Sequence, residues 1–465
     1  MPVLQEAIEV ARSPAECFRY LRDFSTAEQW DPGVYRAARI TPGLPEPGTE
    51  FEVLLDTPGR RTPMRYRLDE CLPDERLVLT GWSDRIHARD VISLEPAASG
   101  GTHITYTAEL SFSGAAGLVA PALKPGLTRM GRRAVAGLQQ ALAQPEAPAE
   151  PDWRDRLRYR TLLPAAWQFT ARGYRAMPDK GLSEFMDGQT VAITGATSGL
   201  GLAAACELAR LGADLVLIGR GRDRLKAATD EIRAFSGRPV ETMTTFETDL
   251  ALMSNAREVG ERIRSKFPGL DVLINNAGAL FDHRGETTEG HEQALAIHLL
   301  APWILTRTLM PALEQGGGRV VNVASGGLYA QGLHLDDMAF EQEPYDGSKA
   351  YARAKRALVA VTEHWAEQHP DRNVTFNSMH PGWADTPGVV RALPAFHRRL
   401  RPWLRDARMG ADTMVWLAST RAVRDRSGEF WFDRKPAPTA VLPGTAVTPG
   451  QREELIRWLE AQAPE

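Results

Sequence analysis

The chain has 465 residues, of which 43% are hydrophobic and 25% charged, and its formal net charge is −4 at pH 7. This length exceeds one ordinary core and predicts two to three domains, and the composition excludes global disorder. The slight acidic excess argues against a nucleic-acid partner, which would usually need a basic surface.

The cysteines Cys17, Cys71 and Cys206 lie far apart in the chain and include no CxxC pair. They cannot form a zinc site by themselves, so we expect no metal, and they fit a reducing compartment. The N-terminus lacks the basic and apolar regions of a signal peptide, and no stretch reaches the roughly 20 apolar residues that span a bilayer. We therefore expect a cytoplasmic protein.

Residues 1–145 are predicted to form short strands around two helices. An alternating run at 4–10 precedes a helix that Ser13 and Pro14 open and that continues to Phe24. A long helix at 127–142 closes this part. Together these elements predict an α+β helix-grip domain, in which a curved antiparallel sheet wraps the long helix. The remaining strands are expected at 50–56, 64–71, 76–81, 86–94 and 102–112.

A change of composition marks the boundary after this domain. Residues 144–152 (QPEAPAEPD) contain prolines and acids without an apolar period, which is typical of a linker. The segment 152–187 is richer in aromatic residues and predicts helices packed on one of the domains. We therefore divide the chain into a domain at 1–145, a linker with packing helices at 146–187, and a domain at 188–465.

The rhythm after residue 187 alternates strand and helix. Apolar runs at 191–193, 215–218, 272–274 and 320–323 are typical of buried parallel strands, and each is followed by a helical period. The prediction for this part is a doubly wound α/β sheet of the Rossmann type.

A glycine-rich turn, Thr194 to Gly201, follows the first of these strands and leads into a helix expected at 202–211. Glycines let backbone N–H groups approach a pyrophosphate, and a helix N-terminus carries partial positive charge there. A P-loop is excluded because no Gly-Lys-Ser/Thr follows. Since any tight strand-to-helix turn favours glycine, the loop alone does not establish a nucleotide site.

Further motifs in the expected order make residues 188–433 resemble the short-chain dehydrogenase/reductase family. The glycine turn matches TGxxxGxG, residues 275–278 match the NNAG turn, Ser325 follows the fifth strand of the family, and Pro381-Gly382 match the PG motif. Two stretches, 379–388 and 432–436, resemble one member of the family in particular, and a retinol-dehydrogenase-like group more distantly. The resemblance implies a cofactor site of Gly195, Thr197, Ser198, Gly199, Leu200, Gly201, Asp249, Leu250, Asn276, Ala277, Gly278, Tyr351, Lys355, Pro381, Gly382 and Thr386.

Two overlapping YxxxK pairs compete for the catalytic position, Tyr345/Lys349 and Tyr351/Lys355. Each places a phenol and an ammonium one helical turn apart on one face. Lys355 lies 26 residues before Pro381, close to the separation typical of the family, whereas Lys349 lies 32 residues before it. We therefore choose Tyr351 and Lys355, and expect Tyr345 to cap the preceding loop and Lys349 to point off the face.

Carbonyl reduction places negative charge on oxygen and needs a proton donor beside fixed hydrogen-bond donors. A free phenol titrates near pH 10, and a neighbouring ammonium together with an oxidised nicotinamide lowers that pKa. In the roles that the resemblance implies, Ser325 holds the substrate oxygen, Tyr351 exchanges its proton and Lys355 also binds the nicotinamide ribose. The alternative is a Tyr and a Lys on a solvated helix face.

One departure from the family falls at His298, where the family has an asparagine that holds a water of the proton relay. A histidine can also bind a water, which would keep activity with an altered pH dependence. The alternatives are a degenerate active site or a satisfied core histidine. We favour an active enzyme.

Cofactor choice is decided at the end of the second strand, where an acidic residue would bind the ribose 2′-hydroxyl of NAD. Gly219 stands at that position, and Arg220 after it is placed to pair with a 2′-phosphate. NADP(H) is therefore favoured over NAD(H), against the alternative that this arginine is solvated surface.

Residues 391–408 contain six arginines and one acid, with apolar residues at helical spacing. The resemblance places this segment in the lid over the substrate. A lid or oligomer face with solvated arginines is preferred to a lid that also contacts an anionic membrane, for which the candidate residues are Phe396 and Trp403.

The N-terminal part resembles the START-like or polyketide cyclase superfamily. The residues that carry this resemblance are Val10 to Pro14 with Phe18, Asp23-Phe24, Trp30 to Pro32, and Gly100 to Thr102 before Tyr106. It implies an apolar cavity between sheet and long helix that suits a hydrophobic ligand. We assign no catalysis to this part, because lone histidines on strands, such as His87 and His103, are more often surface or packed residues.

The function expected from the sequence is an NADP(H)-dependent oxidoreductase that interconverts a lipophilic alcohol and its ketone or aldehyde, with a fused ligand-binding domain. A homo-oligomer is compatible with the sequence. The alternative is a non-catalytic protein that binds nucleotide and lipid, in which His298 marks lost chemistry. A cyclase or dehydratase in the N-terminal part is a third interpretation, and it requires an acid/base pair that faces the cavity.

Overall fold

The computed structural model describes residues 3–57, 60–113, 115–143, 147–148, 167–177, 183–370 and 373–463. The chain divides into two compact units, one within residues 1–146 and the other formed by residues 147–177 and 183–465. The predicted linker at 144–152 therefore lies almost entirely outside the described residues.

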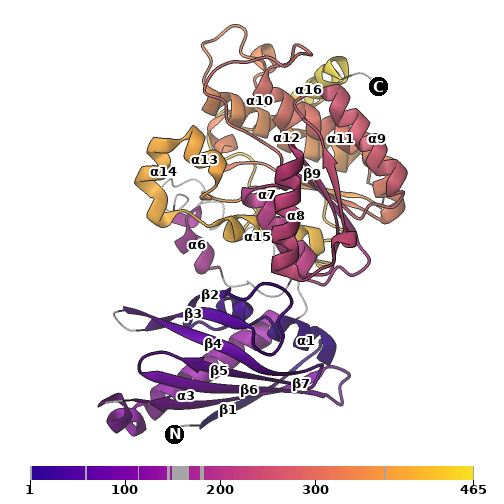
Figure 1. Cartoon of the computed structure of the whole chain (residues 1–465). Coiled ribbons are helices and arrows are strands. Elements are labelled where there is room, and N and C mark those ends of the chain that lie inside the picture. Colours follow the sequence, from indigo (N-terminus) through magenta and orange to yellow (C-terminus); the bar gives the residue numbers. More distant parts are fainter. Residues whose placement is uncertain are drawn as a thin grey trace. The chain divides into compact units, whose positions relative to one another are not determined.

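The first unit is a seven-stranded antiparallel sheet with the long helix α3 across it (Figure 1). The strands follow the order β1-β7-β6-β5-β4-β3-β2, so the first and last strands pair and the rest form a meander. Ser13 and Glu16 form a capping box that starts α1. The elements are β1 Val3–Val10, α1 Pro14–Leu21, α2 Ala27–Trp30, β2 Val34–Arg39, β3 Glu50–Thr57, β4 Arg60–Leu72, β5 Arg76–Trp82, β6 Ile86–Pro96, β7 Thr102–Phe112 and α3 Ala115–Leu142.

The second unit is built on an eight-stranded sheet in the order β10-β9-β8-β11-β12-β13-β14-β15, parallel except for the last pair. Its strands are β8 Thr190–Thr194, β9 Asp214–Gly219, β10 Met243–Glu247, β11 Val272–Asn275, β12 Arg319–Val323, β13 Thr375–Met379, β14 Phe430–Phe432 and β15 Lys435–Pro436.

Helices cover this sheet in two layers (Figure 1). α7 contacts both α8 and α15, while α9, α11 and α12 share the main apolar core with residues of the sheet. This is the doubly wound fold that the sequence predicts. The helices are α6 Ala171–Arg175, α7 Gly199–Arg210, α8 Arg222–Ser236, α9 Met253–Lys266, α10 Gln293–Leu295, α11 Ala301–Gly316, α12 Gly347–Gln368, α13 Pro387–Ala392, α14 Pro394–Leu400, α15 Ala407–Ser419 and α16 Pro449–Gln462.

Several expectations about single elements are wrong. The helix after the glycine turn begins at Gly199 rather than at residue 202, and α1 ends at Leu21 rather than at Phe24. The long helix α3 begins at Ala115 rather than at residue 127. The run from Gln293 to Gly316 is a helix long and apolar enough to cross a membrane, contrary to the expectation that no stretch would be. Because 78% of its most apolar window is buried inside the structure, its apolar character is explained by core packing.

Candidate active site

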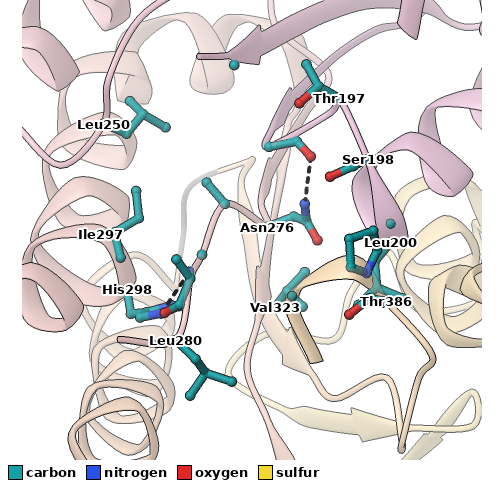
Figure 2. Close-up of a pocket in the computed structure, with 18 of the residues that line it drawn as sticks. Thr197, Ser198, Leu200, Leu250, Asn276, Leu280, Ile297, His298, Val323 and Thr386 are labelled. Carbon is teal, nitrogen blue, oxygen red and sulfur yellow. Dashed lines mark hydrogen bonds between the residues drawn. The ribbon is translucent and has the colours of Figure 1, made fainter. Parts of the chain in front are cut away.

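A cleft of about 490 Å³ lies at the carboxyl ends of β8, β9, β11 and β12 (Figure 2). The carboxyl edge is where parallel α/β sheets bind ligands, because the loops after the strands converge there. Of the residues that the sequence assigns to the catalytic and cofactor sites, Gly201, Ser325 and Gly382 do not line the cleft. Those that do are Gly195, Thr197, Ser198, Gly199, Leu200, Arg220, Asp249, Leu250, Asn276, Ala277, Gly278, His298, Tyr351, Lys355, Pro381 and Thr386.

The glycine turn is shaped for close backbone approach. Gly195 has a φ of 67°, and a Cβ there would lie 2.9 Å from the Cα of Ala277. A Cβ on Gly201 would lie 2.4 Å from the carbonyl oxygen of Gly195. Ser198 stands at the N-cap of α7 without a side-chain cap, so N–H groups of the first turn remain available to an anion. The residues present therefore fit a dinucleotide pyrophosphate.

The NNAG turn is tied directly to this loop (Figure 2). Asn276 donates from Nδ2 to the carbonyl oxygen of Thr194 at 2.9 Å, and the backbone N–H of Ala277 donates to Thr194 Oγ1 at 2.9 Å. Asn275 continues inward and donates to Asn322 Oδ1 at 2.8 Å. These bonds fix the floor of the cleft to the ends of three strands.

Tyr351 and Lys355 lie on α12 and line the cleft, and Ser325 follows β12 beside them. Burial raises the pKa of Tyr351, while a hydrogen bond with the Ser325 side chain lowers it. Lys355 donates from Nζ to the carbonyl oxygen of Val323 at 2.6 Å, and burial lowers its pKa to about 7. The sequence leads us to expect a lowered phenol pKa; in this structure burial is the larger influence and the pKa is raised.

The competing pair lies elsewhere. Tyr345 precedes α12 and donates from its hydroxyl to Glu292 Oε1 at 3.1 Å. Burial is the largest cause that raises the pKa of Tyr345, followed by the charge of Glu292. Lys349 is exposed, and neither residue lines the cleft. The structure thus brings Ser325, Tyr351 and Lys355 together and leaves Tyr345 and Lys349 outside.

His298 sits in a π-helical turn, Ala296–Leu300, between α10 and α11. Such turns are rare and recur at functional sites. Its Nε2 lies 2.7 Å from the carbonyl oxygen of Ala279, and its buried Nδ1 has no partner among the described residues (Figure 2). Burial and the charge of Lys355 hold the pKa of His298 well below its usual value, so the imidazole is neutral.

Two arginines lie at the end of the cleft that follows β9. Arg220 and Arg224 both line it, and Arg220 Nη1 lies 3.8 Å from Asp249 Oδ2. A Cβ on Gly219 would lie 2.9 Å from Thr197 Cγ2 and 3.3 Å from Leu225 Cδ2, so this turn leaves no room for an acidic side chain without rearrangement. Sequence reasoning missed Arg224, although it lies only four residues after Arg220.

The segment after the PG motif forms α13 and α14, and its arginines are not all solvated. Arg405 is 1% exposed and pairs with Asp433 at 2.6 Å, and Arg408 pairs with Glu207 at 3.0 Å. Thr386 caps α13 by accepting a hydrogen bond from the backbone N–H of Val389. The expectation of solvated arginines is therefore wrong for Arg405, whose guanidinium instead holds the segment in place.

Other residues near the substrate end escaped prediction. Leu280, Phe281 and Val389 add apolar surface to the cleft, and none belongs to a motif. Phe169, from the segment before the first strand, packs on Trp383 and accepts a hydrogen bond from its backbone N–H at 2.8 Å. Only the general apolar character of these residues could have indicated them.

Comparison with known proteins agrees with this geometry. Residues 189–394 match the family described as short chain dehydrogenase, and residues 1–143 match the family described as polyketide cyclase / dehydrase and lipid transport.

Among curated proteins, the chain is 39% identical to Dehydrogenase/reductase SDR family member 12 of Bos taurus over 64% of this chain and 97% of that protein. It is 40% identical to the protein of the same name from Homo sapiens over 59% of this chain and 86% of that protein. Retinol dehydrogenase 14 of Homo sapiens is 32% identical over 58% of this chain and 86% of its own length. The chain belongs to the short-chain dehydrogenase/reductase family of NAD(P)-dependent oxidoreductases.

Proposed function

We propose that the second unit interconverts a lipophilic alcohol and its ketone or aldehyde with NADP(H), through Ser325, Tyr351 and Lys355. The observation that carries this proposal is that Tyr351 and Lys355 line the cleft where the glycine loop ends, with the Ser325 side chain within hydrogen-bonding reach of the Tyr351 phenol. A bound nicotinamide would supply or accept the hydride at this place.

In reduction, the hydroxyl of Ser325 holds the carbonyl oxygen and the phenol of Tyr351 gives it a proton. The raised pKa of Tyr351 keeps the phenol protonated at neutral pH, as a proton donor requires. Lys355 stabilises negative charge on the phenol oxygen and binds the ribose of the cofactor. In oxidation the same groups act in reverse.

Two arginines support the preference for NADP(H). Arg220 and Arg224 line the cleft after β9, where a 2′-phosphate would lie, and a charge-assisted hydrogen bond to phosphate is among the stronger polar contacts. Gly219 stands at the position where an acidic residue would select NAD. Thr197 and Leu225 lie so close to it that a side chain at this position would need them to move.

A lipophilic substrate is supported by the apolar lining of Leu280, Phe281 and Val389. The names of two matches also favour a lipophilic substrate. One relative is named a retinol dehydrogenase, and retinol is an apolar alcohol. The family that matches the N-terminal part is described partly by lipid transport. We place the activity in the cytoplasm, in keeping with three free cysteines.

The test is NADPH oxidation with a panel of lipophilic aldehydes and ketones, including retinal, followed at the absorbance band of the reduced nicotinamide. Tyr351→Phe should reduce turnover at least about a thousandfold, since the proton donor is lost. Tyr345→Phe, which removes the other phenol of the overlapping motif, should leave turnover within about twofold. Equal loss in both variants, or none in Tyr351→Phe, would contradict the proposal.

A non-catalytic nucleotide-binding protein is the second candidate, because the neutral His298 replaces the asparagine of the family and its Nδ1 has no partner among the described residues. Tight NADPH binding without turnover of any panel member would favour it.

A further inference from the structure

A buried histidine that the proposed function does not use lies at the end of β13. His380 follows this strand directly, precedes the Pro381-Gly382 turn, and is 1% exposed. Its Nδ1 accepts a hydrogen bond from the backbone N–H of Gly382 at 3.2 Å. Because a neutral imidazole carries one N–H, the ring proton then lies on Nε2.

Four aromatic rings surround this imidazole. It stacks on Phe432, with centroids 4.0 Å apart and planes at 7°, and on Phe430 at 5.6 Å and 23°. Phe169 and Tyr329 meet it edge-on, with centroids at 4.8 and 6.2 Å. Its Nε2 is buried and has no hydrogen-bond partner among the residues that the structure describes.

These surroundings suit an apolar ring better than an imidazole. A buried donor without a partner lowers stability, whereas a phenyl ring would fill the same space without that cost. Burial and the charge of Arg405 hold the pKa of His380 well below its usual value, so the ring stays neutral and Nδ1 stays an acceptor. Packing alone therefore does not explain the imidazole, and its bond to Gly382 is what distinguishes it from a phenyl ring.

The turn that receives this bond is tightly packed and borders the reductase cleft. Gly382 has a φ of 72°, and a Cβ there would lie 2.5 Å from Arg405 Nε. Pro381 before the glycine and Thr386 after it both line the cleft. A side-chain acceptor that binds the N–H two residues on is the arrangement of an Asx turn, with which asparagine and aspartate fix turns of this kind.

The same ring lies next to the turn that follows Ser325. A Cβ on Gly326 would be in van der Waals contact with His380 Cε1, at 3.8 Å. The strands that lead into the two turns, β12 and β13, are paired, and the backbone N–H of Ala324 donates to the carbonyl oxygen of Met379 at 2.7 Å. The imidazole therefore lies between the turn of Ser325 and the turn that it holds through Nδ1.

We propose that His380 is a positioning residue for the nicotinamide. Its bond to Gly382 keeps Pro381 at a fixed place in the wall of the cleft, and this wall would hold the nicotinamide next to Tyr351. His380 itself does not line the cleft, so it acts through the turn, and this role rests on the proposed function.

Two substitutions separate the acceptor from the ring. His380→Asn keeps an acceptor, because asparagine Oδ1 reaches the N–H of Gly382 in an Asx turn, and it loses the aromatic stacking. His380→Phe keeps the stacking and loses the acceptor. His380→Phe should lower kcat for carbonyl reduction about tenfold to a hundredfold, and His380→Asn should lower it less than about threefold, since small displacements near the reacting groups are costly. The melting temperature should follow the ring instead, unchanged or higher in His380→Phe and lower in His380→Asn.

A histidine that serves packing alone would give the opposite order of activities. Turnover that is kept in His380→Phe and lost in His380→Asn would therefore overturn the proposal. His369→Phe is the matched control, because His369 also packs on a phenylalanine, Phe376 at 5.6 Å, and does not line the cleft. This control should leave kcat within about twofold of the wild type.

Ligand binding tests the same role without turnover, and also if His380→Asn fails to fold. The probes are NADPH, followed by the fluorescence of its bound nicotinamide, and 2′,5′-ADP, which carries the adenosine and the 2′-phosphate without the nicotinamide. His380→Phe should weaken NADPH binding at least about fivefold, of the order of one net hydrogen bond, and leave 2′,5′-ADP binding within about twofold. Unchanged NADPH binding, or equal weakening of both ligands, would overturn the proposal. The selective loss in a protein without any turnover would support the role of His380 and contradict the proposed function.

Discussion

The imidazole of His298 meets the ring of Tyr351 edge-on, with centroids 4.8 Å apart and planes at 87°. On its other side the imidazole fills the space that a side chain at position 278 would need, since a Cβ on Gly278 would lie 2.3 Å from His298 Cε1. His298 therefore depends on Gly278 and touches the proposed proton donor.

We expect Gly278→Ala to displace this imidazole and to lower kcat/KM at least about tenfold. The same change in a His298→Asn background should cost much less, because the shorter amide leaves room for the methyl group. A double-mutant cycle on kcat/KM measures the coupling. Additive losses would show that the two residues act independently.

The pH dependence of alcohol oxidation should report the bond between Ser325 and Tyr351. This bond lowers the pKa of Tyr351, so Ser325→Ala should raise that pKa. Because oxidation needs the phenolate, the rise of oxidation activity with pH should then occur at a higher pH than in the wild type. One hydrogen bond corresponds to a shift of up to about one pH unit. Ser325→Thr keeps a hydroxyl and should restore the original profile; a profile unmoved in Ser325→Ala contradicts the assignment.

Cofactor preference should depend on Arg220. Arg220→Ala should raise the KM for NADPH about tenfold to a hundredfold and leave the KM for NADH nearly unchanged, because only NADPH carries the 2′-phosphate. Arg222→Ala is the matched control, since this exposed arginine pairs with Glu247 and does not line the cleft. If both variants respond alike, general electrostatics rather than a phosphate contact explains the preference.

Substrate binding should depend on Phe169, which contacts Trp383, His380, Tyr329 and Phe432. Phe169→Ala leaves a cavity that costs about 3–5 kcal/mol and loosens the segment after the PG motif. We expect a larger rise in KM for the lipophilic carbonyl than for NADPH. Trp167→Ala, at a position that is 48% exposed, should change neither constant; an equal effect of both variants would argue against a specific role for Phe169.

Asp90 should make the first unit less stable as pH rises. The pKa of Asp90 in the fold is about 7, above the ordinary 3.8. Ionising this buried carboxyl group therefore lowers the free energy of unfolding. The loss is absent below about pH 4, grows between pH 4 and 7, and is complete above pH 7. Asp90→Asn should therefore stabilise the unit at pH 8 by up to about 4 kcal/mol, and have little effect at pH 4. Hydrogen exchange of β6 and β7, compared between wild type and variant at each pH, measures this; stabilisation at pH 4 as large as at pH 8 would be inconsistent with the raised pKa.

Strands with a clear apolar run or alternation, such as β8, β9 and β11, could be predicted from the sequence, whereas β13 could not, because it buries polar groups. β13 carries Asn377 and Ser378 inward, and Asn377 is satisfied by bonds to Arg426 and Trp431. The partners that make such a strand possible lie far away in the chain, so periodicity does not reveal it. β2 was missed for a related reason, because only Ala37 along it is fully buried.

The same distinction holds for the site. The glycine turn, the NNAG turn and the pair Tyr351/Lys355 are local patterns, and the structure places all of them at one cleft. Asp90 and the two tyrosines that lower its pKa, Tyr66 and Tyr106, come from three strands. Of the three, only Tyr106 stands in a stretch that carries a family resemblance. The raised pKa of Tyr351 also could not be foreseen, because burial is a property of the assembled fold.

The contacts of Arg405 also determine where a truncated protein that is still an active enzyme has to begin. The guanidinium of Arg405 donates to the carbonyl oxygens of Gln168 and Phe169 at 2.6 and 3.1 Å, well before the first strand of the sheet. A truncated protein that starts at Ser183 would leave part of a buried cation unsatisfied, which is costly. One that starts ahead of Gln168 retains both acceptors and should keep its catalytic rate.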